Sequence, residues 1–156
     1  MKKGFAFLLA IVCLIAFCMV PASAATVDAT DTIDDDLVIS ALEIPVYGPK
    51  GSATGTIVQG ERKTYSFEVT PGHTKMDIQL SWGSTSNNLA LMFTSPSGVT
   101  YGPYDDYAES STPNARFTIH VESAGAVLPY GTWEFDVTGK SVTGTETFTL
   151  IINSYD

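Results

Sequence analysis

The segment KTYSFEVT, residues 63–70, decides the fold class, because its apolar and polar side chains alternate. The apolar residues at every second position are Tyr65, Phe67 and Val69. Successive side chains of a β-strand point to opposite faces. This period of two therefore predicts a strand with one face in a core and the other face in solvent.

The same alternation recurs along the rest of the chain. It is found in residues 76–82, 117–122, 133–138 and 148–152. In residues 89–93 the intervening residues are also apolar, which predicts a strand covered on both faces. Weaker strands are expected at 37–44 and 54–59, and turns rich in glycine or proline separate the strands. About eight short strands predict an all-β fold, a jelly-roll-like antiparallel β-sandwich, with Trp82 and Trp133 in its core.

The first 24 residues have the organisation of an export signal. Lys2 and Lys3 precede an apolar run over residues 5–20, and Ala22-Ser23-Ala24 fits the pattern of a cleavage site. A membrane-spanning helix needs about 20 apolar residues, so we expect cleavage after Ala24, and the alternative is a segment retained as an anchor. The expected organisation is a signal peptide at 1–24, an acidic flexible lead-in at 25–36 and a β-sandwich domain at 37–156.

Removal of the signal leaves an acidic chain without cysteine. Cys13 and Cys18 both lie in the signal, and residues 25–156 carry six Lys or Arg and 17 Asp or Glu, which gives a net charge of −11. This charge repels a phosphate backbone, so we expect no nucleic-acid partner. We expect a secreted or cell-surface protein with no membrane span after signal cleavage.

Several segments occur in a recognisable order. They are GTIVQG at 55–60 followed by TYSFEV at 64–69, NLALMF and TSPSG at 88–98, and YGTWEFDV at 130–137. In order and spacing they resemble the pre-peptidase C-terminal domains of bacteria and archaea. The last two segments also resemble, more weakly, the P-domain of proprotein convertases. Many pre-peptidase domains carry acidic residues in the strand where this chain has Asn88 and Ala90.

The resemblance covers roughly residues 54–153. It implies a jelly-roll β-sandwich that accompanies secreted peptidases and other exported enzymes. In those proteins the domain is an accessory, targeting or substrate-binding module.

The stretch from Tyr101 to Glu109 is expected to be a loop and is the best candidate for a functional site. Its Asp105, Asp106 and Glu109 offer hard oxygen ligands of the kind that Ca²⁺ prefers. The alternative is a solvated acidic loop that binds no metal.

Four tyrosines in or near this stretch suggest a ligand-binding surface. They are Tyr101, Tyr104, Tyr107 and Tyr130. Their flat rings with a polar tip suit stacking on sugar rings or anchoring a protein partner. The alternative is that they cover the open end of the sandwich and shield its core.

Catalysis is not expected. His73 lies in a turn and His120 faces outward from a predicted strand, and neither has a nearby motif that would orient it as a base. Glu134 and Asp136 share one strand face, as solvated carboxylates commonly do. The expected function is non-catalytic binding of extracellular polysaccharide, cell wall or protein. The alternatives are a structural cell-envelope protein that packs against copies of itself and, third, an extracellular hydrolase.

Overall fold

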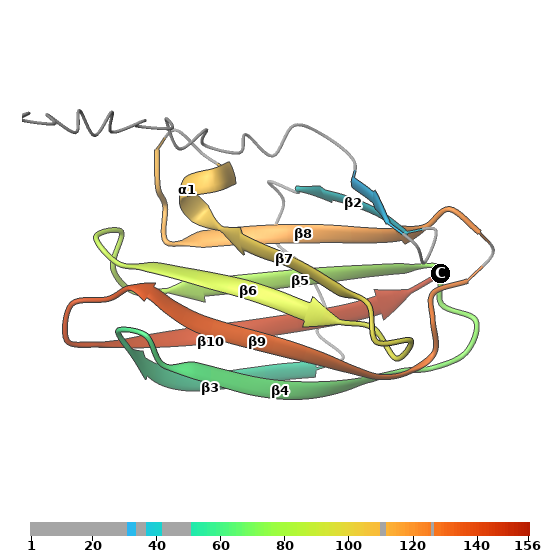
Figure 1. Ribbon diagram of the computed structural model, residues 1–156, viewed down its shortest axis with the longest axis horizontal. Coiled ribbons are helices and arrows are strands. Elements are labelled where there is room, and N and C mark those ends of the chain that lie inside the picture. Colours follow the sequence, from blue (N-terminus) through green and yellow to red (C-terminus); the bar gives the residue numbers. More distant parts are fainter. Residues whose placement is uncertain (1–30, 34–36, 42–50, 110–111, 126) are drawn as a thin grey trace, which may run out of the picture.

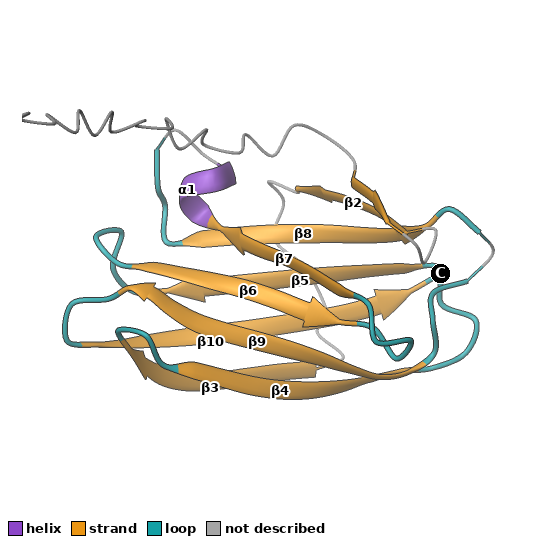
Figure 2. Ribbon diagram, viewed as in Figure 1, coloured by secondary structure: helices purple, strands orange, loops and turns teal. Residues whose placement is uncertain are grey.

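The computed structural model describes residues 31–33, 37–41, 51–109, 112–125 and 127–156. Two antiparallel sheets pack face to face (Figure 1). The first sheet runs in the order β1 (Asp31–Ile33), β2 (Leu37–Ala41), β8 (Arg116–Ser123), β5 (Lys75–Trp82), β10 (Thr145–Tyr155) and β3 (Gly51–Val58). The second runs in the order β4 (Arg62–Val69), β9 (Gly131–Ser141), β6 (Asn88–Thr94) and β7 (Thr100–Asp105). The one helical element in the described residues is a single turn, α1 (Asp106–Glu109), so the predicted all-β class is confirmed (Figure 2).

The eight strands from β3 to β10 have the nested pairing of a jelly roll. β6 pairs with β7, β5 with β8, β4 with β9 and β3 with β10, all antiparallel. The chain is thus a long hairpin that closes at the β6–β7 turn and wraps over into two sheets. The β1–β2 pair extends the first sheet beside β8. The jelly-roll arrangement predicted from the sequence is present.

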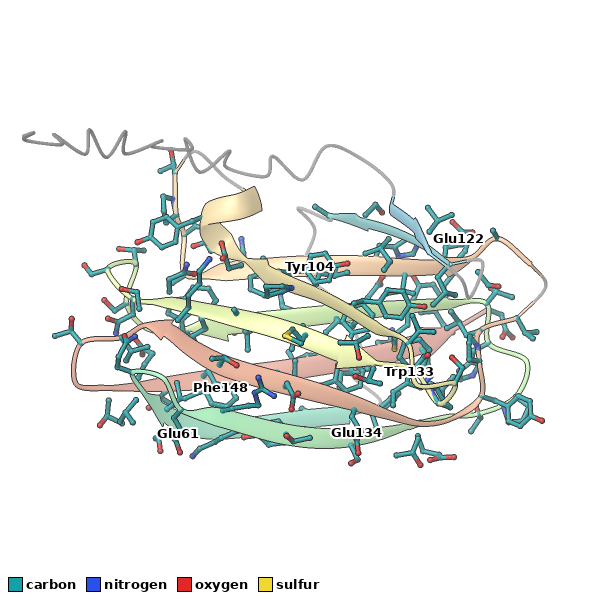
Figure 3. The ribbon with its side chains drawn as sticks, in the orientation of Figure 1. Glu61, Tyr104, Glu122, Trp133, Glu134 and Phe148 are labelled. Atoms are coloured by element: carbon teal, nitrogen blue, oxygen red, sulfur yellow. The ribbon has the colours of Figure 1, made fainter. Side chains whose placement is uncertain are left out.

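Alternation along the strands places the large apolar side chains between the two sheets. Trp82 and Trp133 are both buried, as predicted. The ring of Phe93 lies at the centre of an aromatic cluster, with ring centroids 6.1 Å from Trp133 and 6.0 Å from Phe135. Figure 3 shows that Trp133 lies near the end of the sandwich where β9 begins.

The predicted loop at 101–109 is wrong, because these residues form most of β7 and the turn α1. Gly102 and Pro103 led to the error, since both residues are typical of turns. Here Gly102 has a positive φ of 104°, and a Cβ atom on it would lie 2.8 Å from the carbonyl oxygen of Leu91. The pairing with β6 shifts register at this point, which is how an edge strand accommodates the two residues.

Residues 31–33, within the expected lead-in, form β1 and pair with β2. The rest of the lead-in and the expected signal peptide lie outside the described residues. Within the described part, none of the helices has the length and apolar character that crossing a membrane requires.

A buried carboxylate joins two turns at the α1 end of the sandwich. Glu146, at the start of β10, accepts hydrogen bonds from the backbone N–H groups of Gly83 (3.1 Å) and Ser84 (3.2 Å). It also accepts one from Asn87 Nδ2 (2.7 Å), and Asn87 Oδ1 accepts one from the backbone N–H of Thr143 (2.9 Å). The β5–β6 turn is therefore tied to the β9–β10 turn by charge-assisted hydrogen bonds.

Replacing Trp133 by Ala is expected to lower the free energy of unfolding by about 3–5 kcal/mol, because a fully buried ring is lost from the core. Urea denaturation measures this loss. Glu134→Ala, one residue on and facing solvent, is the matched control and should change stability by no more than about 0.5 kcal/mol. A loss below about 1 kcal/mol for Trp133→Ala would contradict this packing.

Glu146→Gln is expected to destabilise the protein at neutral pH by about 1–3 kcal/mol, because an amide nitrogen cannot accept the bonds that Glu146 Oε2 accepts from Ser84 and Asn87. Burial raises the pKa of Glu146, but the hydrogen bonds outweigh burial and hold the pKa below its ordinary value of 4.5. The stabilisation is therefore present above pH 4.5 and is lost as the pH falls through the folded-state pKa. The free energies of unfolding of the parent and Glu146→Gln proteins should converge on acidification. A difference that stays constant with pH would show that the charge of Glu146 is not the cause of the destabilisation.

Candidate functional site

Two of the four candidate tyrosines belong to the core. Tyr101 and Tyr104 on β7 stack on the ring of Phe93, with centroid distances of 5.2 and 5.8 Å. Tyr101 is only 1% exposed, and Tyr104 is partly buried (Figure 3). Both rings therefore shield the core, which was the alternative to a role in ligand binding.

The other two tyrosines are exposed but lie at opposite ends of the sandwich. Tyr107 on α1 is 52% exposed and Tyr130 before β9 is 66% exposed. Along β6, Ala90 pairs with Asp105 beside α1, whereas Thr94 pairs with Glu134 near Tyr130. The four tyrosines therefore do not form one row, and Tyr130 is the most exposed of them.

The loop that carries Tyr130 is held firmly against the scaffold. The indole Nε1 of Trp133 donates to the carbonyl oxygen of Pro129 (2.9 Å), and the backbone N–H of Leu128 donates to the carbonyl oxygen of His73 (2.7 Å). Leu128 is buried, while Val127 is exposed like Tyr130. The loop thus presents an exposed ring and an exposed aliphatic group from an anchored backbone.

A second turn lies beside this loop. A Cβ atom on Gly131 would lie 3.4 Å from Cβ of Pro96, and the positive φ of 120° at Gly131 favours glycine there. The exposed Pro96 belongs to the β6–β7 turn, where the backbone N–H of Ser95 donates to the carbonyl oxygen of Val99 (2.9 Å). We call Pro96, Val127 and Tyr130 the tyrosine end. All three expose apolar surface at one end of the sandwich.

The acidic residues proposed as calcium ligands make contacts within the protein. Asp105 pairs with the ammonium group of Lys140. Asp106 is 1% exposed, and its Oδ2 accepts hydrogen bonds from the backbone N–H groups of Asn114 (2.7 Å) and Ala115 (2.8 Å). Its other oxygen, Oδ1, is buried and has no hydrogen-bond partner among the described residues. The side chain of Glu109 lies outside the described part of the chain.

The side chains of Asp105 and Asp106, the two candidate ligands that the structure describes, both have partners within the protein. No group of three or more His, Cys, Asp or Glu side chains in the described residues is placed to hold a metal ion. Asp106 instead fixes the segment that leads into β8, and calcium binding stays a prediction.

A polar network that the sequence did not reveal lies on the outer face of the first sheet. His120 Nδ1 lies 2.6 Å from Asp77 Oδ1, and the hydroxyl of Tyr155 donates to Asp77 Oδ2 (3.0 Å). Burial and this hydrogen bond to a carboxylate raise the pKa of Tyr155 to about 12. The strands β8, β5 and β10 bring these residues side by side, and only knowledge of their register could have predicted the contact.

The geometry of this network does not suit nucleophilic catalysis. The second ring nitrogen of His120, Nε2, faces a carboxylate oxygen of Glu122 at 3.9 Å. A catalytic base needs one nitrogen on an orienting carboxylate and the other on a nucleophile. In His120 both nitrogens face carboxylates. His73 Nδ1 lies 2.7 Å from the hydroxyl of Ser154, but Ser154 is buried.

Comparisons with known proteins show only distant similarity. No family model matches the chain, and no curated protein matches it in sequence. The structure of the CspB protease of Clostridium perfringens is similar over 64% of this chain, with 12% identity and a TM-score of 0.49, and the match spans 25% of the protease chain. The SPBc2 prophage-derived protein YomS matches over 71% of this chain and 100% of its own length, with 16% identity and a TM-score of 0.32.

Millimolar calcium is expected to raise the melting temperature if Asp105 and Asp106 contribute ligands, since binding to the folded state alone stabilises it. The double variant Asp105→Asn, Asp106→Asn should abolish the rise, because a neutral amide is a weaker ligand than a carboxylate. The amide oxygen introduced by Asp106→Asn can still accept the bonds from Asn114 and Ala115, so the fold should persist. Glu134→Gln, which removes one exposed carboxylate elsewhere, is the control. A melting temperature that does not change with calcium would exclude the site.

Proposed function

We propose that this chain is an exported, non-catalytic β-sandwich module that binds extracellular polysaccharide or protein through the tyrosine end. The observation that carries the proposal is the 66% exposure of Tyr130 on a loop whose neighbours, Leu128 and Pro129, are fixed to the scaffold. An exposed ring on a fixed backbone loses little conformational freedom on binding, so it is suited to act as an anchor.

Polysaccharide is the ligand class that the tyrosine end favours. A tyrosine ring offers a flat face for stacking on a sugar and a hydroxyl for hydrogen bonding. The formal charge of residues 25–156 is strongly negative, which disfavours acidic partners and allows neutral sugars. A protein partner anchored by Tyr130 and Val127 is the second outcome that a binding experiment can return.

We further propose that the domain is related to the pre-peptidase C-terminal domains. The nested pairing of β3 to β10 supports this relationship, because the resemblance of residues 54–153 implies a jelly roll. The accessory role of such domains in exported enzymes is consistent with binding. The contacts of His73 and His120 support a module without its own catalytic centre.

Tyr130→Ala is expected to weaken binding to cell-wall polysaccharide about fivefold or more, because truncating an anchoring aromatic residue costs over about 1 kcal/mol of binding free energy. A pull-down with isolated cell wall and purified glycans identifies the ligand, and a titration gives the affinity. Tyr107→Ala, at the other end of the sandwich, is the matched control and should bind normally. Equal affinity of the parent and Tyr130→Ala proteins, or equal loss in both variants, would disprove a site at the tyrosine end.

A further inference from the structure

Three of the four sheet edges in the described structure carry features that discourage pairing with another chain. β1 has only three residues, and β7 contains Pro103 and a register shift. β4 carries Arg62, Lys63 and Glu68. Short length, proline, irregular register and charge are the usual protections of an edge strand.

The fourth edge, β3, has none of these protections. Its eight residues, GSATGTIV, include no charged residue and no proline. All eight pair in regular register with β10 on one side, and no described strand pairs with the other side. β3 is therefore a long, regular and uncharged edge in an otherwise acidic protein.

The free backbone groups of this edge can be identified from one end of the strand. The N–H of Val58 donates to Glu61 Oε2 (3.0 Å), and its carbonyl oxygen accepts from the N–H of Glu61 (3.1 Å). The backbone N–H and C=O groups of Val58 thus point away from β10. Since backbone groups alternate along a strand, Ser52, Thr54 and Thr56 point the same way and present N–H and C=O groups to the free edge.

The core is closed behind this edge. A Cβ atom on Gly55 would lie 2.6 Å from the hydroxyl oxygen of Tyr65, and one on Gly51 would lie 2.7 Å from the ring of Phe67. The two glycines let these β4 side chains cover the inner face of β3. An incoming strand would therefore meet backbone groups and the exposed hydroxyl side chains, without opening the core.

The geometry points to β3 as a self-association edge that pairs with β3 of a second copy of this chain, antiparallel and around a two-fold axis at Thr54. In this register Thr54 lies opposite its own counterpart, and Ser52 lies opposite Thr56. The free groups of these three residues form three hydrogen-bonded pairs. Hydroxyl residues face hydroxyl residues across the pair, which is a favourable cross-strand combination. No charge is set against a like charge along the strands, although each copy of residues 25–156 carries −11.

Sedimentation velocity of protein produced from the whole chain tests this surface. The parent protein should show a dimer whose fraction increases from micromolar to millimolar concentration. Thr54→Lys should raise the dimer dissociation constant about tenfold or more, because two lysines then oppose each other at the axis. Thr149→Lys is the matched control, since Thr149 is the partner of Thr54 on the neighbouring strand β10 and is not at the edge. Thermal melts of both variants show whether the fold is retained.

A cross-linking experiment tests the register. Residues in a hydrogen-bonded antiparallel pair have Cα atoms about 5.5 Å apart, which suits a disulfide. In a chain with Cys13→Ser and Cys18→Ser, Thr54→Cys should form a disulfide-linked dimer on mild oxidation, and Thr149→Cys should not. A parent protein that stays monomeric at millimolar concentration overturns the proposal. So does a dimer that Thr54→Lys leaves intact, which would place the contact elsewhere.

Discussion

The nested antiparallel pairing of β3 to β10 is the constraint on which the rest of the molecule depends. Each strand pairs with the one at the same chain distance from the β6–β7 turn. This symmetry gathers the β6–β7 turn and the β8–β9 loop at one end and α1 with the β9–β10 turn at the other (Figure 1). Tyr107 and Tyr130 are separated for this reason. In a jelly roll, two loops can therefore contribute to one binding surface only when the strand pairing places them at the same end.

The two ends are stabilised by different chemistry. At the α1 end, buried carboxylates of Glu146 and Asp106 accept backbone N–H bonds from turns and from the segment entering β8. At the tyrosine end, the main-chain carbonyls of Pro129 and His73 accept bonds from Trp133 and Leu128. Charge-assisted bonds to a buried carboxylate are strong only while the carboxylate is ionised. Protonation of Glu146 therefore weakens the α1 end as the pH falls through the lowered pKa of this residue. It also follows that part of the acidic composition stabilises the fold and is not available to ligands.

The sequence predicted the strands whose side chains alternate and missed the features that depend on pairing. Tyr65, Phe67 and Val69 mark β4 because local sequence alone sets the period of two. β7 was missed because Gly102 and Pro103 are typical of turns, and their place in a strand depends on the register shift against β6. The contact of His120 with Asp77 was missed for the same reason, since it joins residues 43 positions apart on neighbouring strands. The contacts of Asp105 with Lys140, and of Asp106 with the N–H groups of Asn114 and Ala115, were not visible in the sequence either, because they depend on how the strands and turns come together.

The proposed edge and the proposed binding surface have a geometric consequence when combined. The β3 edge runs along the length of the sandwich, and the tyrosine end lies at one extremity of it. A two-fold axis through Thr54, perpendicular to the strands, reverses the strand direction, so the tyrosine ends of the two copies would point in opposite directions. Such a dimer could not place both tyrosine ends side by side on one short stretch of polymer, and its avidity for a single flat surface would be low. It would instead connect two ligands on opposite sides. Binding at the tyrosine end and pairing at β3 would then act together as a cross-link between extracellular polymers, which neither surface provides alone.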